Sequence, residues 1–353
     1  MSVVSLDKQQ DPVPDPVPDQ MHDVVPDGVE DQPRRLAAAR SLQDQIFRGG
    51  SLGVGVLVMV IFGSIGFFLA LQSIPTLSRY GWSFFTESDW QPEQDAVGMS
   101  AVLLGTFLVG LIAMLTAFPL SLACALFISE YCGPGLRRLL VAMVDLMAAV
   151  PSIIYGLWGF FLLQPQLIPV AHWLHQNLGF IPFFKVETDP NEPVWAQSQY
   201  TGSAFMAGLV VAMMVIPIAC AVMQDVFGQA PVGEREAALA LGATRWGMIR
   251  TVVLPFGRGG IVGGTMLGLG RALGETVAVL LIIGVAFDIK LRVLEVGTIT
   301  VSSLIANRFS EATAGQLSAL LTAGFVLFVI TVLVNTIAAI IVSRGRSGAS
   351  TEI

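Results

Sequence analysis

Two charged residues, Arg271 and Glu275, lie inside a long apolar stretch of this 353-residue sequence, GGIVGGTMLGLGRALGETVAVLLIIG, which begins at Gly259. A charge near the centre of a bilayer costs roughly 2.5–3.5 kcal/mol, so such residues are rare and usually face the interior of a helix bundle. An arginine is permanently charged, and its fork of donors matches the oxygens of phosphate or carboxylate. The pair therefore predicts either an anion path through the membrane or a buried structural ion pair.

The spacing of the pair predicts where it lies, if one helix runs through the stretch. Arg271 is then about 18 Å from the cytoplasmic end of the helix at Gly259, which is near the midplane. Glu275 follows one turn later on the same face, because residues i and i+4 are neighbours. Gly264 and Gly268 share that face, and small residues at this spacing predict close packing against another helix.

A polar, basic segment, EAALALGATRWGMIRTVVLP, separates two long apolar stretches. Its opening residues are strong helix formers, and an acidic group in a first turn complements the helix dipole. Gly242 predicts a helix stop or a close contact, and Pro255 predicts that the helix does not continue into the next span. The fixed positions of the pattern are Glu236, Ala237, Ala238, Gly242, Val252, Leu254 and Pro255.

Other residue types that could carry chemistry are sparse. The cysteines have neither metal-ligand nor disulfide spacing, and they are Cys124, Cys132 and Cys220. His172 and His175 have a spacing that could bind metal, but without further ligands nearby we interpret them as residues of a solvated loop. No lysine ends a G-x-x-x-x-G-K-[ST] loop, so the sequence predicts no ATP site, no metal site and no cofactor in this chain.

The composition is that of a membrane protein, because 54% of the residues are hydrophobic and only 13% are charged. Six apolar runs approach or exceed the roughly 20 residues that cross a bilayer. They lie near 52–73, 100–127, 139–163, 204–227, 259–286 and 317–342. Asp145 falls in the third run, towards its cytoplasmic side, and we expect it to be a structural partner for an arginine. The sequence thus predicts an all-α bundle of six transmembrane helices.

The distribution of basic residues predicts the topology. With the N-terminus inside, thirteen lysines and arginines are cytoplasmic and five lie on the opposite side. The positive-inside rule therefore places both termini and the 228–258 loop in the cytoplasm. The outer loop 164–203 contains several prolines, which predict irregular backbone. It is either a surface for a partner protein or a passive connector.

Three parts make up the predicted domain organisation. Residues 1–48 form an acidic tail whose prolines predict extended, disordered backbone. Residues 49–346 form the transmembrane domain, and residues 347–353 form a short C-terminal tail. The acidic tail is not a signal peptide, because it lacks a basic beginning followed by an apolar run.

Three segments together resemble the permease subunits of the bacterial high-affinity phosphate ABC importer. They are VPSIIYGLWGFF (150–161), the 236–255 segment and GRALGETVAV (270–279). The 236–255 pattern alone resembles the cytoplasmic coupling loop of ABC importer permeases in general. The segment FFTESDWQPEQDAVG (84–98) resembles the PstC-type permease more than its PstA-type partner. The likeness extends over about residues 50–345, and the long acidic tail departs from it.

This resemblance implies a type I ABC importer permease bundle in the bacterial inner membrane. It implies a heterodimer with a PstA-type permease, a PstB-type ATPase dimer that binds ATP and magnesium, and a phosphate-binding protein that delivers substrate. Arg271 and Glu275 become candidates for phosphate transit, and the 236–255 segment becomes the ATPase contact. The chain itself is then a permease and not an enzyme.

Three alternatives stay open at this point. The chain is also compatible with a permease for another oxyanion such as sulfate, molybdate or phosphonate. A secondary anion transporter or channel could use Arg271 and Glu275 without ATP. A membrane scaffold is the third alternative, although it leaves the intramembrane charges unexplained.

Overall fold

The protein is described by a computed structural model that covers residues 42–91, 96–186 and 199–345. It divides into two compact units, residues 1–57 and 58–353, and the boundary falls inside the first helix, α1 (Leu42–Tyr80). The predicted tails at 1–41 and 347–353 lie outside the described residues. Residues 42–48 were expected to belong to the tail, but they form the beginning of α1.

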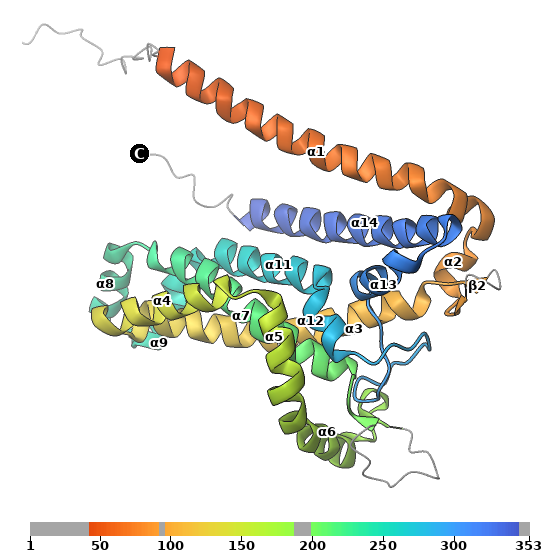
Figure 1. Cartoon of the computed structure of the whole chain (residues 1–353). Coiled ribbons are helices and arrows are strands. Elements are labelled where there is room, and N and C mark those ends of the chain that lie inside the picture. The colour runs from red at the N-terminus through yellow and green to blue at the C-terminus, as the bar shows by residue number, and fades with distance from the viewer. Residues whose placement is uncertain (1–41, 92–95, 187–198, 346–353) are drawn as a thin grey trace, which may run out of the picture. The chain divides into compact units, whose positions relative to one another are not determined.

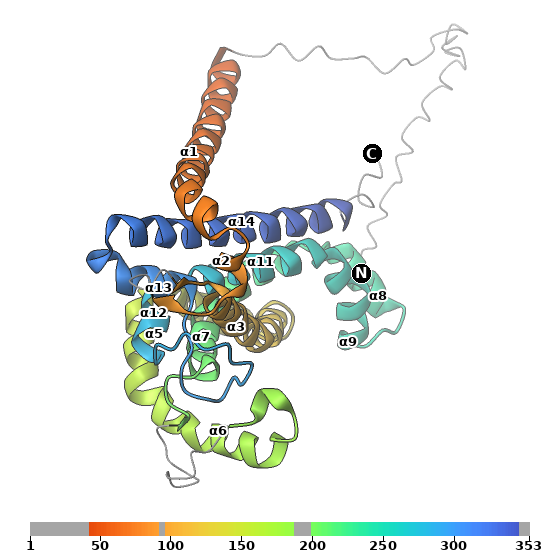
Figure 2. The same cartoon turned by 90° about the vertical axis from the view of Figure 1, so that its right-hand side faces the viewer.

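The second unit is built almost wholly of helices (Figures 1 and 2). The long helices after α1 are α3 (Ser100–Leu126), α7 (Ala204–Gly228), α11 (Arg258–Gly274) and α14 (Ala314–Gly345). The remaining α-helices are α2 (Ser83–Thr86), α4 (Pro134–Ala149), α5 (Ser152–Trp158), α6 (Gln164–Leu178), α8 (Val232–Ala240), α9 (Arg245–Met248), α10 (Leu254–Phe256), α12 (Val277–Ile282) and α13 (Val301–Arg308). Two short strands, β1 (Trp90–Gln91) and β2 (Ala96–Val97), pair in antiparallel orientation. The all-α class predicted from the sequence is confirmed.

Short turns of other helix types connect several of these elements. Three π-helical turns extend or join α-helices, namely η2 (Phe127–Tyr131), η3 (Gly159–Leu163) and η6 (Ile249–Val253). The 3₁₀ turns that lie wholly within the described ranges are η4 (Pro182–Phe184) and η7 (Phe309–Glu311). As a result, α5, η3 and α6 form one continuous helical stretch.

Five helical stretches in the described part are long and apolar enough to cross a membrane: 45–80, 100–131, 152–178, 204–228 and 315–340. A sixth span exists if two helices joined at a 68° bend, 245–256 and 258–274, are taken as one. Four of the predicted runs correspond to single helical stretches that are long and apolar enough to cross a membrane. The predicted third and fifth runs need correction.

The third run was placed at 139–163, but the chain breaks within it. Helix α4 ends at Ala149, because Val150 precedes Pro151 and takes an extended conformation with ψ 130°. The span that follows runs from 152 to 178, so residues 164–178 are helical where irregular backbone was expected. Pro165 lies inside the continuous helical stretch, directly after the π-helical turn η3, and a spanning helix tolerates a proline where such local backbone adjustment accommodates the missing N–H.

The same break moves Asp145 out of the predicted span. It lies on α4, where its side chain is exposed. No ion pair of Asp145 occurs in the portion of the chain that the structure describes. The expected pairing with an arginine is therefore not formed among the residues that the structure describes.

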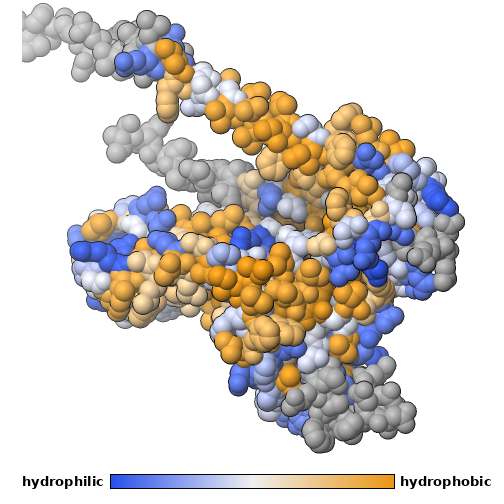
Figure 3. Space-filling model, viewed as in Figure 1, coloured by the Kyte–Doolittle hydropathy of each residue, from blue (hydrophilic) through white to orange (hydrophobic). Residues whose placement is uncertain are grey.

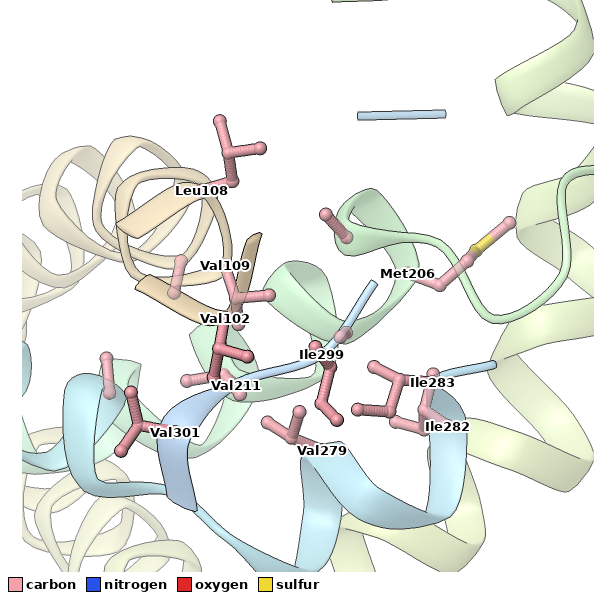
Figure 4. Close-up of a cluster of buried hydrophobic side chains, with 14 of the residues drawn as sticks. Val102, Leu108, Val109, Met206, Val211, Val279, Ile282, Ile283, Ile299 and Val301 are labelled. Carbon is pink, nitrogen blue, oxygen red and sulfur yellow. The ribbon is translucent and has the colours of Figure 1, made fainter. Parts of the chain in front are cut away.

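Two buried clusters hold the second unit together. In the larger cluster, side chains of α12 such as Val279 and Ile282 pack beside Val211 of α7 and Ile299 of the following loop (Figure 4). The smaller cluster joins the ends of α3 and α7 to α4 and to the helices after α8. Apolar residues form a broad band on the face shown in Figure 3, and hydrophilic residues gather at the end that carries α8 and α9.

Candidate substrate path and coupling surface

The helix that carries Arg271 ends before it reaches Glu275. Helix α11 stops at Gly274, and Glu275 takes an extended conformation with φ −69° and ψ 127°. A second helix, α12, begins at Val277. The Glu275 carboxylate accepts a hydrogen bond of 3.2 Å from the Ala278 N–H, a donor at the start of a helix that has no partner within that helix. The prediction of one helix over 259–286 is therefore wrong, and Glu275 caps the second half.

This break separates the two charges that the sequence placed on one helical face. In the described chain, no nitrogen of Arg271 lies within 4.0 Å of a Glu275 oxygen. The neighbour rule for residues i and i+4 requires an unbroken helix, and that condition fails at Gly274. Glu275 is 8% exposed, so its charge is held inside the bundle with its carboxylate bonded to the backbone.

Arg271 lies in the last turn of α11, where a cation interacts favourably with the helix dipole. Its side chain is half-buried, and its Nε is fully buried without a hydrogen-bond partner among the described residues. Tyr155 of α5 is close enough for the Arg271 charge to act on it. The Tyr155 hydroxyl, however, donates to the Met147 carbonyl over 2.8 Å. Among the described residues the guanidinium therefore has no hydrogen-bond or ion-pair partner.

The glycines of α11 define a packed face and an open face. A Cβ added at Gly264 would lie 2.9 Å from the Ala219 carbonyl of α7, and one added at Gly268 would lie 2.6 Å from Val215. The predicted close packing of these two glycines is confirmed. A Cβ at Gly263 or Gly274 would meet no atom within 4 Å. Helix α11 is thus held by its backbone against α7, with space on another side.

A cavity of about 530 Å³ lies between α3, α11 and α14, with Leu273 in its wall. Its lining is almost wholly apolar. The hydroxyls of Thr106 and Thr265 line it, but they donate to the carbonyls of Val102 and Ile261. An anion there would lose its hydration without gaining donors, which is strongly unfavourable. This cavity is therefore not suited to an oxyanion.

The segment that separates the two apolar stretches folds as α8 and a tight helix end. The Ala243 N–H bonds to the Ala238 carbonyl over 3.1 Å, and the Gly242 N–H bonds to the Leu239 carbonyl over 3.0 Å. These two bonds form a Schellman motif, which requires a left-handed residue. Gly242 supplies it with φ +86°. The predicted helix stop at Gly242 is confirmed, and Thr244 then caps α9 by accepting from the Gly247 N–H.

One other expectation about this segment is wrong. Helix α8 begins at Val232, so the acidic residue of its first turn is Glu234, and Glu236 lies in the middle of the helix. The helix that carries Pro255 does not continue into the next span, as predicted: it ends at Phe256 and the chain bends by 68° before α11 begins at Arg258. Pro255 is tolerated near the start of α10, after a π-helical turn.

The outer side of α8 and of the loop after it is a surface without partners in the described chain. Glu236, Ala237 and Leu239 are exposed, Leu241 is 90% exposed, and Trp246 of α9 is also exposed. Ala238 and Leu254 are partly buried and pack on the smaller cluster. One side of the segment therefore anchors it, and the other side exposes apolar side chains.

The anchoring of α8 includes a contact that sequence reasoning missed. Arg235 was counted only as a cytoplasmic cation, but it forms an ion pair of 3.2 Å with Glu130 at the end of the α3 segment. The sequence held two separate signals. Glu130 lies only three positions beyond the predicted span 100–127, and Arg235 directly precedes the Glu-Ala-Ala pattern. Neither residue suggested the other.

His172 and His175 lie on helix α6 and are partly buried, so their predicted placement in a solvated loop is wrong. The His175 Nδ1 lies 3.2 Å from the Val186 N–H and 3.2 Å from the Phe184 carbonyl. The His172 ring meets the buried Tyr200 ring edge to face. Over the described ranges, no group of three or more histidine, cysteine, aspartate or glutamate residues is placed to hold a metal ion.

Comparison with known proteins places these features in a family. Residues 117–347 match the family described as binding-protein-dependent transport system inner membrane component. The phosphate transport system permease protein PstC 2 of Mycobacterium tuberculosis is 40% identical over 299 residues, covering 84% of this chain and 90% of that protein. The protein PstC of Pasteurella multocida is 36% identical over 307 residues, covering 85% and 91%. A solved bacterial ABC transporter for import of the polysaccharide alginate is 16% identical, with a TM-score of 0.48, and the match covers 86% and 98%.

Proposed function

Because this chain belongs to the binding-protein-dependent transport system inner membrane component family, we propose that it is the permease subunit of an ATP-driven phosphate importer. Its similarity to PstC permeases of phosphate transport systems over most of both chains supports the choice of substrate. The proposed site rests on a single observation, which is the environment of Arg271. Arg271 is a permanently charged, half-buried group of the helix bundle, and it has no ion pair within the described chain.

Arg271 is proposed to bind phosphate as it passes the membrane. A guanidinium presents several N–H donors in a plane, which fits two oxygens of one phosphate. It offsets part of the cost of bringing the anion into a region of low dielectric constant. Glu275 lies at the hinge that follows, and its negative charge keeps the affinity low enough for release. Its bond to the start of α12 also fixes the backbone just after Arg271.

The surface made by α8 and the loop after it is proposed to receive a separate ATPase. Glu236, Ala237, Ala238 and Gly242 form the part that docks, and Leu254 and Pro255 connect it to α11. Exposed apolar side chains such as Leu241 support this role, because an apolar surface is stabilised when a partner covers it. With this assignment, the 228–258 segment and both termini lie on the cytoplasmic side of a bacterial inner membrane, in agreement with the distribution of basic residues.

The proposed mechanism is alternating access, in which ATP binding and hydrolysis shift the populations of two states. ATP closes the two ATPase subunits, which press on α8, and the bundle opens outwards to accept phosphate from the phosphate-binding protein. Hydrolysis restores the inward-facing state. The path is completed by a PstA-type permease, and ATP and magnesium are bound by the PstB-type ATPase dimer. This chain then supplies the path and the lever, and it is not an enzyme.

Phosphate uptake into vesicles that contain the complete complex tests the proposal. Uptake should require ATP inside the compartment that holds the ATPase, and sulfate, molybdate and phosphonate should not replace phosphate. Arg271→Ala should abolish uptake while the complex still assembles, and Glu236→Ala should weaken the link between ATP hydrolysis and uptake. Uptake that persists without ATP would show a secondary transporter instead. Uptake of another oxyanion in preference to phosphate would show that phosphate is not the substrate.

A further inference from the structure

Arg235 connects the coupling helix α8 to the ends of two other helical segments. Its Nη2 lies 3.2 Å from a carboxylate oxygen of Glu130, in the π-helical turn that follows α3. The same Nη2 donates to the Phe227 carbonyl, in the last turn of α7. Ser129 donates to the same Glu130 oxygen over 2.6 Å. These four groups therefore form one polar junction at the place where α3, α7 and α8 meet.

This junction is well shielded from water. The Glu130 side chain is 4% exposed and the Arg235 side chain is 19% exposed. The Phe227 carbonyl is one of the last acceptors of its helix, which have no partner inside the helix and attract a cation. A shielded pair with a second acceptor on the guanidinium fixes the direction of the Arg235 side chain more narrowly than an exposed pair would.

The rest of α8 is attached only loosely to the bundle. None of its residues is buried, and its apolar anchor to the smaller cluster is Ala238. It is followed at once by the left-handed Gly242 and a change of direction. Because α3 and α7 pack against each other along their length, a force on α8 that passes through Arg235 reaches both helices together.

A buried ion pair is weak evidence for stability, because apolar residues of similar volume often serve as well. Its better-supported role is to fix the orientation of one element on another. We propose that Arg235 and Glu130 are positioning residues that transmit the movement of α8 to α3 and α7 during ATP-driven transport. This inference rests on the proposed function, and it adds α3, which the chain does not connect directly to α8, to a transmission through α7, which precedes α8, and through α11, which follows it.

The test measures phosphate uptake and ATP hydrolysis in the same vesicles, with the complete complex. The variants are Glu130→Gln, Arg235→Gln and the double variant, with Arg235→Lys as the conservative change. Arg138→Gln is the matched control, because Arg138 is an exposed arginine of α4 with no ion pair in the described chain. Assembly is measured by co-purification of all subunits.

We expect each single change to glutamine to lower the phosphate transported per ATP by roughly fivefold or more, with assembly and ATP hydrolysis retained. The double variant should be no worse than either single variant, because both remove one contact. Arg235→Lys should transport more phosphate per ATP than Arg235→Gln, and Arg138→Gln should transport as much as the wild type.

Three results would overturn the inference. The first is a wild-type ratio in the glutamine variants at equal assembly. The second is an additive loss in the double variant. The third is failure of assembly in all variants including Arg235→Lys, which would show a purely structural pair. A wild-type complex without ATP-dependent phosphate uptake would instead refute the proposed function itself.

Discussion

Replacement of Glu275 distinguishes a helix cap from an ion pair. In the structure, the Glu275 carboxylate accepts from the Ala278 N–H over 3.2 Å, and Ala278 is fully buried. Glu275→Ala leaves that buried donor without a partner, which costs about 1–3 kcal/mol. This lowers the ratio of folded to unfolded protein about 5- to 150-fold. Glu275→Gln keeps an oxygen acceptor at the same place, although a neutral one, so we expect a smaller loss of stability than for Glu275→Ala.

The ion-pair alternative gives a different pattern. If Glu275 neutralised Arg271 directly, either change would leave a buried charge unpaired and would cost about 3–5 kcal/mol. The two variants would then be equally unstable. A capping role for Glu275 therefore predicts a clear difference in the free energy of unfolding between Glu275→Gln and Glu275→Ala, and an ion pair with Arg271 predicts none.

The free energy of unfolding can be measured on the purified protein in mixed micelles, by raising the fraction of denaturing detergent and following helix content by circular dichroism. Glu234→Gln is the matched control, because it makes the same change at an exposed position of α8. Equal destabilisation by Glu275→Gln and Glu275→Ala would refute the capping role.

Three further predictions concern backbone packing and the coupling surface. Gly264→Ala should lower the free energy of unfolding by about 1–3 kcal/mol, because its Cβ meets the Ala219 carbonyl at 2.9 Å, whereas Gly263→Ala should be neutral or stabilising in the same detergent titration because its Cβ meets nothing. Gly242→Ala should cost about 1–2 kcal/mol, since its φ of +86° disfavours other residues, and limited proteolysis at this helix end should speed up. Leu241→Ser should weaken ATPase binding roughly 10-fold or more in a titration, because about 1.5–3 kcal/mol of apolar burial is lost, and unchanged binding would place the contact elsewhere.

Much of the fold followed from hydropathy, but proline and capping decided where helices end. The sequence located the spans 100–131, 204–228 and 315–340 to within a few residues, because each is a long apolar run, and it placed the first run inside the longer helical stretch 45–80. It misplaced the third span because Pro151 forces its neighbour out of the helical conformation within a run that is apolar throughout. It also missed the break at Glu275, where no proline marks the position and a side chain bonds to the next helix instead.

Among the site residues, too, some features could be predicted from the sequence and others could not. The glycine spacing of α11 and the stop at Gly242 depend on local backbone geometry, and both were predictable. The pairing of Arg235 with Glu130 joins residues about a hundred positions apart, so it depends on how α3 and α7 pack. Helical periodicity carries no information about such a contact.

The most direct test of the central claim is phosphate uptake by the assembled complex with Arg271 changed. Arg271→Ala and Arg271→Lys are compared with Arg258→Ala, which removes an exposed arginine at the other end of the same helix. The account predicts that Arg271→Ala abolishes uptake, that Arg271→Lys retains a fraction of it because one ammonium replaces the planar fork, and that Arg258→Ala transports normally. Normal uptake by an assembled Arg271→Ala complex would contradict the account.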